Sequence, residues 1–121
     1  MSTSSYQDLR VWQHAIRLAL STYRATERFP KHEVYGLAQQ VRRAAVSIAS
    51  NIAEGKGRNT DKEFRQFLFN ARGSLLELET QLLIAHELSY LPQNAYVELR
   101  EASKEVGRSL AGPLNSLAAA A

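Results

Sequence analysis

The sequence predicts an all-α fold, an up-down-up-down four-helix bundle in one domain that spans residues 1–121. Helix-breaking residues are few, with three prolines and six glycines in 121 residues. Pro30, the pair Gly55 and Gly57, and Pro92 divide the chain into four segments of similar length. Each segment repeats its apolar residues with a period near 3.6, and none shows the alternation that is typical of strands. Four amphipathic helices with short connections bury their apolar faces most simply as a bundle.

We expect the first two helices at about residues 7–28 and 32–54. Pro30 ends the first, and Gly55 with Gly57 ends the second. The expected core stripe of the first helix consists of Leu9, Trp12, Ile16, Ala19 and Tyr23. That of the second consists of Leu37, Val41, Ala44, Ile48 and Ile52.

The third and fourth helices are expected at about residues 60–89 and 92–111. Thr60 followed by Glu63 forms a capping-box pattern at the start of the third. Gly112 and Pro113 are expected to end the fourth helix, which leaves 118–121 as a frayed tail. The two core stripes consist of Phe64, Phe67, Leu68, Ala71, Leu75, Leu78 and Leu82, and of Tyr96, Leu99, Ser103, Val106 and Leu110.

Composition also bounds the class of protein. The chain has no cysteine, which excludes disulfides and thiolate metal sites and fits a reducing compartment. Its apolar runs are shorter than the roughly 18 residues that a membrane span needs. Its first residues lack the basic-then-apolar pattern of a secretory signal. We therefore expect a soluble, cytoplasmic protein that does not contact a membrane.

A second set of apolar residues lies away from these core stripes. In the third helix they recur every seven residues, and in the first helix a similar set lies nearly opposite Trp12. A small monomer rarely exposes such continuous patches. They either widen the core stripe or form a subunit interface, and the seven-residue spacing favours packing between helices. The interface candidates are Val11, Leu18, Phe69, Leu76, Leu83 and Tyr90.

Charge is distributed unevenly along the chain. The net charge is +3, yet residues 1–72 hold twelve Lys and Arg against six Asp and Glu, and residues 73–121 hold three against six. Eleven of the fifteen basic residues are arginine, whose planar guanidinium matches phosphate oxygens. Helical spacing gathers several of them into ridges on the first and third helices. The candidate contact residues are Arg10, Arg17, Arg24, Arg28, Arg42, Arg43, Lys62, Arg65 and Arg72.

Two interpretations of these ridges remain open. The arginines either bind a polyanion such as RNA or DNA, or pair with carboxylates of other helices or subunits, such as Glu77, Glu79, Glu87 and Glu98. Motifs that read base edges are absent from the sequence, so nucleic-acid binding would depend on shape or charge rather than on base sequence.

Catalytic and metal-binding patterns are also missing. His14, His32 and His86 lie on different segments without the Glu-x-x-His or His-Glu-x-x-His spacing of metal sites. Asn51 and Glu54 are read as residues that hydrogen-bond near a helix end, or alternatively as a contact site for a partner. We expect a protein that is not an enzyme and that needs no cofactor and no metal.

Many spaced residues resemble a known family. They are Asp8-Leu9, Val11-Trp12, Phe29-Pro30, Glu33, Tyr35-Gly36-Leu37, Gln40 to Ala45, Ser47-Ile48, Asn51 to Gly55, Phe67-Leu68, Gly73-Ser74, Glu77-Leu78 and Gln81-Leu82. Over roughly residues 6–90 this pattern resembles the bacterial four-helix-bundle family first noticed as proteins encoded by intervening sequences within 23S rRNA genes.

The resemblance implies a homopentamer of bundles. The chain is also similar to the accessory protein of diversity-generating retroelements, a basic pentamer that binds nucleic acid and a reverse transcriptase. No catalytic residue is implied. We expect a non-enzymatic homo-oligomer that binds RNA or DNA through its arginine ridges. The alternative is a protein–protein scaffold, or accessory subunit, without direct nucleic-acid contact.

Overall fold

The computed structural model describes the backbone of residues 5–120 and the side chains of residues 5–117. Within this range the chain is all-α, as expected. Its four α-helices are α1 (Arg10–Thr26), α2 (Leu37–Lys56), α3 (Asp61–Glu87) and α4 (Gln93–Ala120). Two short 3₁₀ helices, η1 (Tyr6–Asp8) and η2 (Lys31–Glu33), precede α1 and α2. The predicted boundaries are therefore close for three helices, and too short at the end of the fourth.

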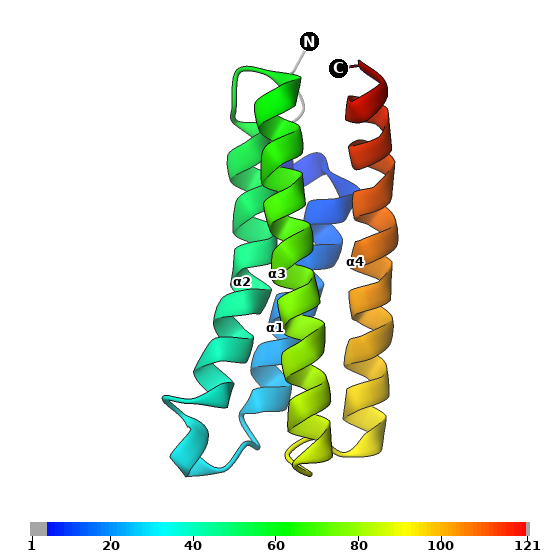
Figure 1. Ribbon diagram of the computed structural model, residues 1–121. Helices are drawn as coiled ribbons and strands as arrows, with labels where there is room; N and C mark the ends of the chain where they lie inside the picture. The colour runs from blue at the N-terminus through cyan, green and yellow to red at the C-terminus, as the bar shows by residue number, and fades with distance from the viewer. Residues whose placement is uncertain (1–4, 121) are drawn as a thin grey trace.

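The four helices run alternately up and down and lie side by side (Figure 1). In the described chain, α1 packs against α2 and α4, and α3 packs against the same two helices. Helices α1 and α3 therefore occupy diagonal corners of the bundle. The most extensive contact joins α2 to α3. None of these helices is both long enough and apolar enough to cross a membrane.

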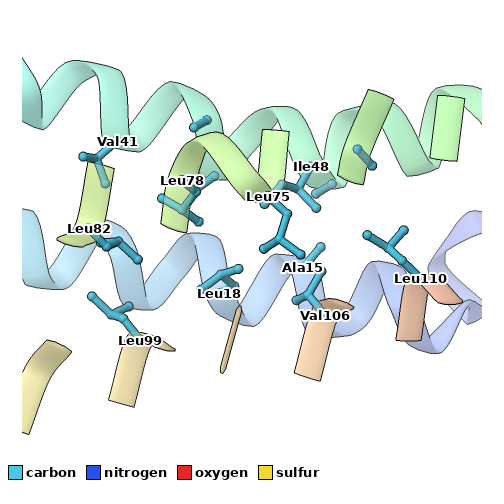
Figure 2. Close-up of a cluster of buried hydrophobic side chains, with 14 of the residues drawn as sticks. Ala15, Leu18, Val41, Ile48, Leu75, Leu78, Leu82, Leu99, Val106 and Leu110 are labelled. Carbon is cyan, nitrogen blue, oxygen red and sulfur yellow. The ribbon is translucent and has the colours of Figure 1, made fainter. Parts of the chain in front are cut away.

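All four helices contribute to one hydrophobic core. Figure 2 shows Leu18 of α1, Ile48 of α2, Leu78 of α3 and Val106 of α4 directed into the same interior. Each of these four side chains is completely buried. Most of the predicted stripe residues of α2, α3 and α4 are buried, and their aromatic members lie at the margin. The periodicity in these three helices therefore identified the core face correctly.

The expected core stripe of α1 was right only in part, because Leu9, Trp12, Ile16 and Ala19 lie at the margin of the core and not at its centre. Its buried residues are Val11, Ala15, Leu18, Thr22 and Thr26. Tyr23, which was expected in the core, is exposed, and Trp12 is only partly buried. Because Val11 and Leu18 are enclosed within the chain's own core, they are not available to a second subunit. The predicted interface therefore loses its α1 half.

The end of the bundle where α1 leads into α2 is held by a hydrogen-bonded carboxylate. One oxygen of Glu33 accepts the Leu37 backbone N–H at 3.0 Å, which caps α2. The other accepts the Tyr90 hydroxyl at 2.9 Å. The Tyr90 ring also lies against buried Phe29, with a centroid distance of 5.5 Å. Tyr90 thus joins the α3–α4 connection to η2, a role within the chain that the sequence analysis did not assign to it.

These contacts of Glu33 predict a contribution to the free energy of unfolding that is lost in acid. The Leu37 N–H, followed by the Tyr90 hydroxyl, lowers the pKa of Glu33 from its ordinary value of 4.5. Folding therefore favours the charged form, and this stabilisation is present above pH 4.5 and is lost as the pH falls through the lowered pKa. When the pH is lowered from neutral to below 4.5, the melting temperature should therefore fall less in Glu33→Gln than in the native chain. Parallel melting curves by circular dichroism test this, and equal losses would contradict it.

The transition from α2 to α3 differs in one respect from the expectation. Gly57 caps α2, but Gly55 lies inside the helix and is buried. A Cβ atom at Gly55 would lie 2.5 Å from the Cβ of Phe67 on α3. Gly55 therefore permits the close approach of the two helices and does not end α2. At the start of α3, the Thr60 hydroxyl accepts the Glu63 N–H at 3.1 Å and donates to the Glu63 carboxylate at 3.0 Å.

Helix α4 does not stop at Gly112 and Pro113, as was expected. It includes Pro113 and continues to Ala120, so the predicted frayed tail is helical up to that residue. Proline inside a helix removes one backbone hydrogen bond and costs about 3 kcal/mol. Leu114 is buried immediately after it, and Leu117 packs against the core. Burial of these two side chains offsets the local cost, because continuing the helix is what brings them to the core.

Candidate functional site

Three arginines of α1 and one from the turn that follows it form a ridge on the surface beside α4, which we call the α1 ridge. Arg10, Arg17, Arg24 and Arg28 are all exposed. The three on the helix span about 21 Å along its axis. Between described residues, neither these four nor the other five candidate cations have a carboxylate within 4.0 Å. The pairing within the chain that was one explanation for the ridge is therefore not observed.

A histidine connects the middle of the α1 ridge to α4. Arg17 donates to Nδ1 of His14 at 3.1 Å, and Nε2 of His14 lies 3.8 Å from the Glu105 carboxylate. Glu105 in turn accepts a hydrogen bond from Arg108 at 2.8 Å. That bond is the main reason why the pKa of Glu105 is lowered. His14 therefore positions Arg17 and does not resemble a metal ligand.

The C-terminal part of the α1 ridge borders a recess of about 260 Å³ between α1 and the start of α4. Arg24 and Arg28 line it together with Pro92 and Asn94. Glu98 also lines the recess but lies more than 4.0 Å from both guanidinium groups. Two cations and one carboxylate leave the recess with a net positive charge, which suits an anionic ligand.

The basic residues of α3 form a second surface near the α2–α3 connection. Lys62 and Arg72 are exposed, and Arg65 is half-buried. Arg65 donates from Nε to the Leu114 carbonyl of α4 at 3.3 Å. The guanidinium carbons of Arg65 and Arg72 lie 4.6 and 5.9 Å from the centre of the Phe69 ring. The second basic surface therefore contains the aromatic ring of Phe69. The sequence analysis had assigned this residue to a subunit interface.

The two candidate arginines of α2 do not join either surface. Arg42 is half-buried and ties α2 to α1, because it donates to the Thr26 hydroxyl at 2.7 Å and to the Tyr23 carbonyl at 3.4 Å. Its guanidinium also lies 4.8 Å from the Tyr23 ring centre. Arg43 lines a recess between α2 and α3 together with Glu77. The Arg42 side chain is therefore used in hydrogen bonds within the fold. Arg43 lies at the α2–α3 edge of the bundle, away from the α1 ridge.

The α1 ridge and the α3 cations lie on opposite sides of α4. The first contacts α4 through His14, and the second through Arg65. Since α1 and α3 are diagonal, the candidates do not form one continuous groove within a chain. Sequence spacing on single helices placed each ridge correctly but carried no information on which edge of the bundle it would occupy.

Three of the predicted interface residues do face solvent. Phe69, Leu76 and Leu83 are 37%, 54% and 47% exposed along one side of α3. Their seven-residue spacing gives a continuous apolar strip, which we call the α3 strip. Sequence analysis missed the apolar surface of α1, where Leu20 is 49% exposed. Tyr23, which the sequence analysis assigned to the core stripe, is exposed as well.

Several polar residues singled out in the sequence have local roles. Asn51 donates to the Ser47 carbonyl and hydroxyl, and Ser47 hydrogen-bonds Ser74 of α3 at 2.8 Å. Glu54 pairs with Arg58 at 2.8 Å. The ring of His86 stacks on Tyr96, and its Nδ1 lies 3.1 Å from the Leu91 carbonyl. The contacts of Asn51 and Glu54 agree with their interpretation as residues that hydrogen-bond near a helix end.

The architecture and these surfaces define a helical-bundle protein with exposed arginine ridges. The family model for the 23S rRNA-intervening sequence protein matches residues 7–112, and the chain belongs to this family. A solved structure with a similar fold is a protein of unknown function from the S23 ribosomal protein family of Bacteroides thetaiotaomicron VPI-5482. It aligns with a TM-score of 0.77 at 20% identity, over 86% of this chain and 97% of that one. No curated protein matches the sequence.

Proposed function

We propose that this protein is a non-enzymatic, cytoplasmic homo-oligomer that binds nucleic acid, with structured RNA as its main ligand. The observation that carries the proposal is the α1 ridge, four exposed arginines without a carboxylate partner among the described residues. Guanidinium groups at this spacing can contact successive phosphates of a nucleic-acid backbone. The family's connection to rRNA genes is consistent with an RNA ligand.

Self-association would strengthen such binding. The α3 strip leaves Leu76 and Leu83 about half exposed, and burial of such apolar surface between subunits is favourable. A pentamer, as the sequence resemblance implies, would repeat each α1 ridge five times on one particle. Several weak phosphate contacts would then add up through a high effective concentration.

The test is a salt series with a labelled RNA hairpin, read by fluorescence anisotropy. For the native protein we expect the logarithm of the affinity to fall steeply with the logarithm of the salt concentration, because phosphate contacts release counterions. The double variant Arg17→Glu with Arg24→Glu should bind at least about tenfold more weakly, with a shallower slope. A native slope near zero would contradict direct phosphate contact.

A matched control separates position from net charge. Arg100→Glu with Lys104→Glu changes the charge by the same amount, but both native side chains line a recess between α3 and α4, away from the α1 ridge. We therefore expect this variant to keep most of its RNA affinity. Equal losses in the two double variants would show that total charge, and not the α1 ridge, governs binding.

A second candidate is a protein–protein scaffold in which the α1 ridge pairs with carboxylates of a neighbouring subunit. The exposed side chains of Glu77, Glu87 and Glu98 favour it, since within the described residues they too form no ion pair. In that case Arg17→Glu with Arg24→Glu would dissociate the oligomer, and RNA affinity would be negligible in both proteins. Size-exclusion chromatography with light scattering distinguishes the two functions.

A further inference from the structure

The two ends of the α3 strip differ in residue type and in the charge that surrounds them. At one end, Phe69 lies between two cations on the same helix, Arg65 one turn before it and Arg72 one turn after it. The next residues of the strip, Leu76 and Leu83, have no aromatic ring and lie in a part of α3 whose charged residues are glutamates. The strip therefore consists of an aliphatic part and a separate aromatic part within a basic surface.

The surroundings of Phe69 are unusually rich in cation–aromatic contacts. Next to it in the α2–α3 region, Arg58 lies 4.6 Å from the ring centre of Phe67, and Lys56 lies 5.9 Å from that of Phe64. These two rings are half-buried, whereas the Phe69 ring is 37% exposed. Phe69 is thus the most exposed ring of the group, and the guanidinium groups of Arg65 and Arg72 lie over it.

The carboxylates in this region do not cancel its charge. Glu54 pairs with Arg58, and neither Asp61 nor Glu63 forms an ion pair among the described residues. Arg72 and Arg65 form no ion pair among the described residues. Arg65 uses its Nε for the Leu114 carbonyl, which fixes the side chain while its terminal nitrogens remain available. An anionic group next to the Phe69 ring would therefore meet two guanidinium groups.

This combination matches the chemistry of unpaired nucleotides. A base can stack on an aromatic ring or on a guanidinium plane, and its phosphates can bind the adjacent arginines. A regular duplex is a poor ligand for Phe69, because its base faces are covered by neighbouring base pairs. An apolar protein surface is also poor, because it would remove water from Arg65 and Arg72 without supplying anions.

We propose that the surface formed by Arg65, Phe69 and Arg72 binds an unpaired stretch of RNA, with one base stacked on the Phe69 ring. This inference rests on the proposed function and deepens it, since it names the part of the RNA that this surface takes. The α1 ridge provides phosphate contacts that do not distinguish paired from unpaired strands. Phe69 adds a contact that only an unpaired base can make.

The experiment compares two labelled ligands of equal length and charge, an oligouridylate and its abasic counterpart, which keeps the phosphates and lacks the bases. Native protein and Phe69→Leu are titrated with both by fluorescence anisotropy. Stacking on an aromatic residue contributes about a tenfold change in affinity per base. We expect the native protein to prefer oligouridylate by about that factor, and Phe69→Leu to bind both ligands with the affinity that the native protein shows for the abasic one.

Two controls make the result specific. Phe69→Trp keeps an aromatic ring and should retain the preference for bases, whereas Leu20→Ala, at an exposed residue of α1, should not affect it. Light scattering of every variant reports the oligomeric state. A drop in particle mass for Phe69→Leu would assign Phe69 to a subunit contact and overturn the inference.

The remaining outcomes separate this inference from the function on which it rests. If the native protein binds both ligands equally and with a steep salt dependence, phosphate binding stands and base stacking on Phe69 is wrong. If neither oligouridylate nor the RNA hairpin binds, both proposals fail together. Only a preference for bases that disappears in Phe69→Leu and persists in Phe69→Trp supports stacking.

Discussion

Replacing Leu18 by alanine should lower the free energy of unfolding by about 3 kcal/mol, whereas Leu20→Ala should lower it by about 0.5 kcal/mol or less. Leu18 is fully buried among residues of all four helices, and Leu20, two residues later, is 49% exposed. The large loss combines the transfer free energy of the removed methyl groups with the cavity that a packed interior cannot close. Denaturant titrations at one fixed protein concentration measure both values.

The comparison also tests the corrected face of α1. If Leu18 were a subunit contact, as its position in the apolar pattern first indicated, Leu18→Ala would mainly reduce the mass of the particle and make its stability depend on protein concentration. We expect instead that the particle mass is unchanged where the variant is folded. Similar small losses for Leu18→Ala and Leu20→Ala would contradict the position of Leu18 in the core.

The reason why sequence analysis misjudged this helix lies in its small and polar core residues. Thr22 and Thr26 are buried because their hydroxyls donate to backbone carbonyls one turn earlier, to Leu18 at 2.8 Å and to Thr22 at 2.9 Å. This internal bonding removes the cost of burying a hydroxyl, but the sequence does not show it. Larger apolar residues such as Trp12 and Tyr23 therefore dominated the pattern, although they lie at the edge.

Helices α2 and α3 were predicted more accurately because their core positions carry large aliphatic residues at regular spacing. Ile48 and Ile52 in α2, and Leu75 and Leu78 in α3, are buried as expected. The end of α4 shows the opposite case, where a local rule for Pro113 was overridden by burial of Leu114. Local signals are reliable where tertiary packing agrees with them, and they fail where it does not.

In the candidate site too, some features follow from local sequence and others depend on tertiary contacts. The spacing of Arg17 and Arg24 on one face of α1 follows from helical periodicity alone. The hydrogen bonds that occupy Arg42, and the contact of Phe69 with Arg65 and Arg72, depend on rotamers and on neighbouring helices. Sequence analysis therefore located the charges, but could not determine which of them the fold would use internally.

Replacing Gly55 by alanine should destabilise the protein by about 1–3 kcal/mol, although alanine is the better helix former. A Cβ atom at this position would lie 2.5 Å from the Cβ of Phe67, as well as 3.0 Å from Cδ1 and 3.3 Å from the carbonyl oxygen of Phe64. A Cβ atom and a backbone carbonyl cannot move away by changing rotamer. Helices α2 and α3 would have to separate along their extensive contact, with loss of packing.

Gly73→Ala is the matched control, because Gly73 lies inside α3 and an added Cβ would have no atom within 4 Å. This substitution should stabilise the chain by about 0.5–1 kcal/mol through reduced backbone entropy. Two identical substitutions in adjacent helices are thus expected to have opposite signs, and denaturant titration measures each. A gain in stability for both would show that α2 and α3 lie farther apart at Gly55 than the close approach to Phe67 requires. The close approach would then not be the reason why this position is a glycine.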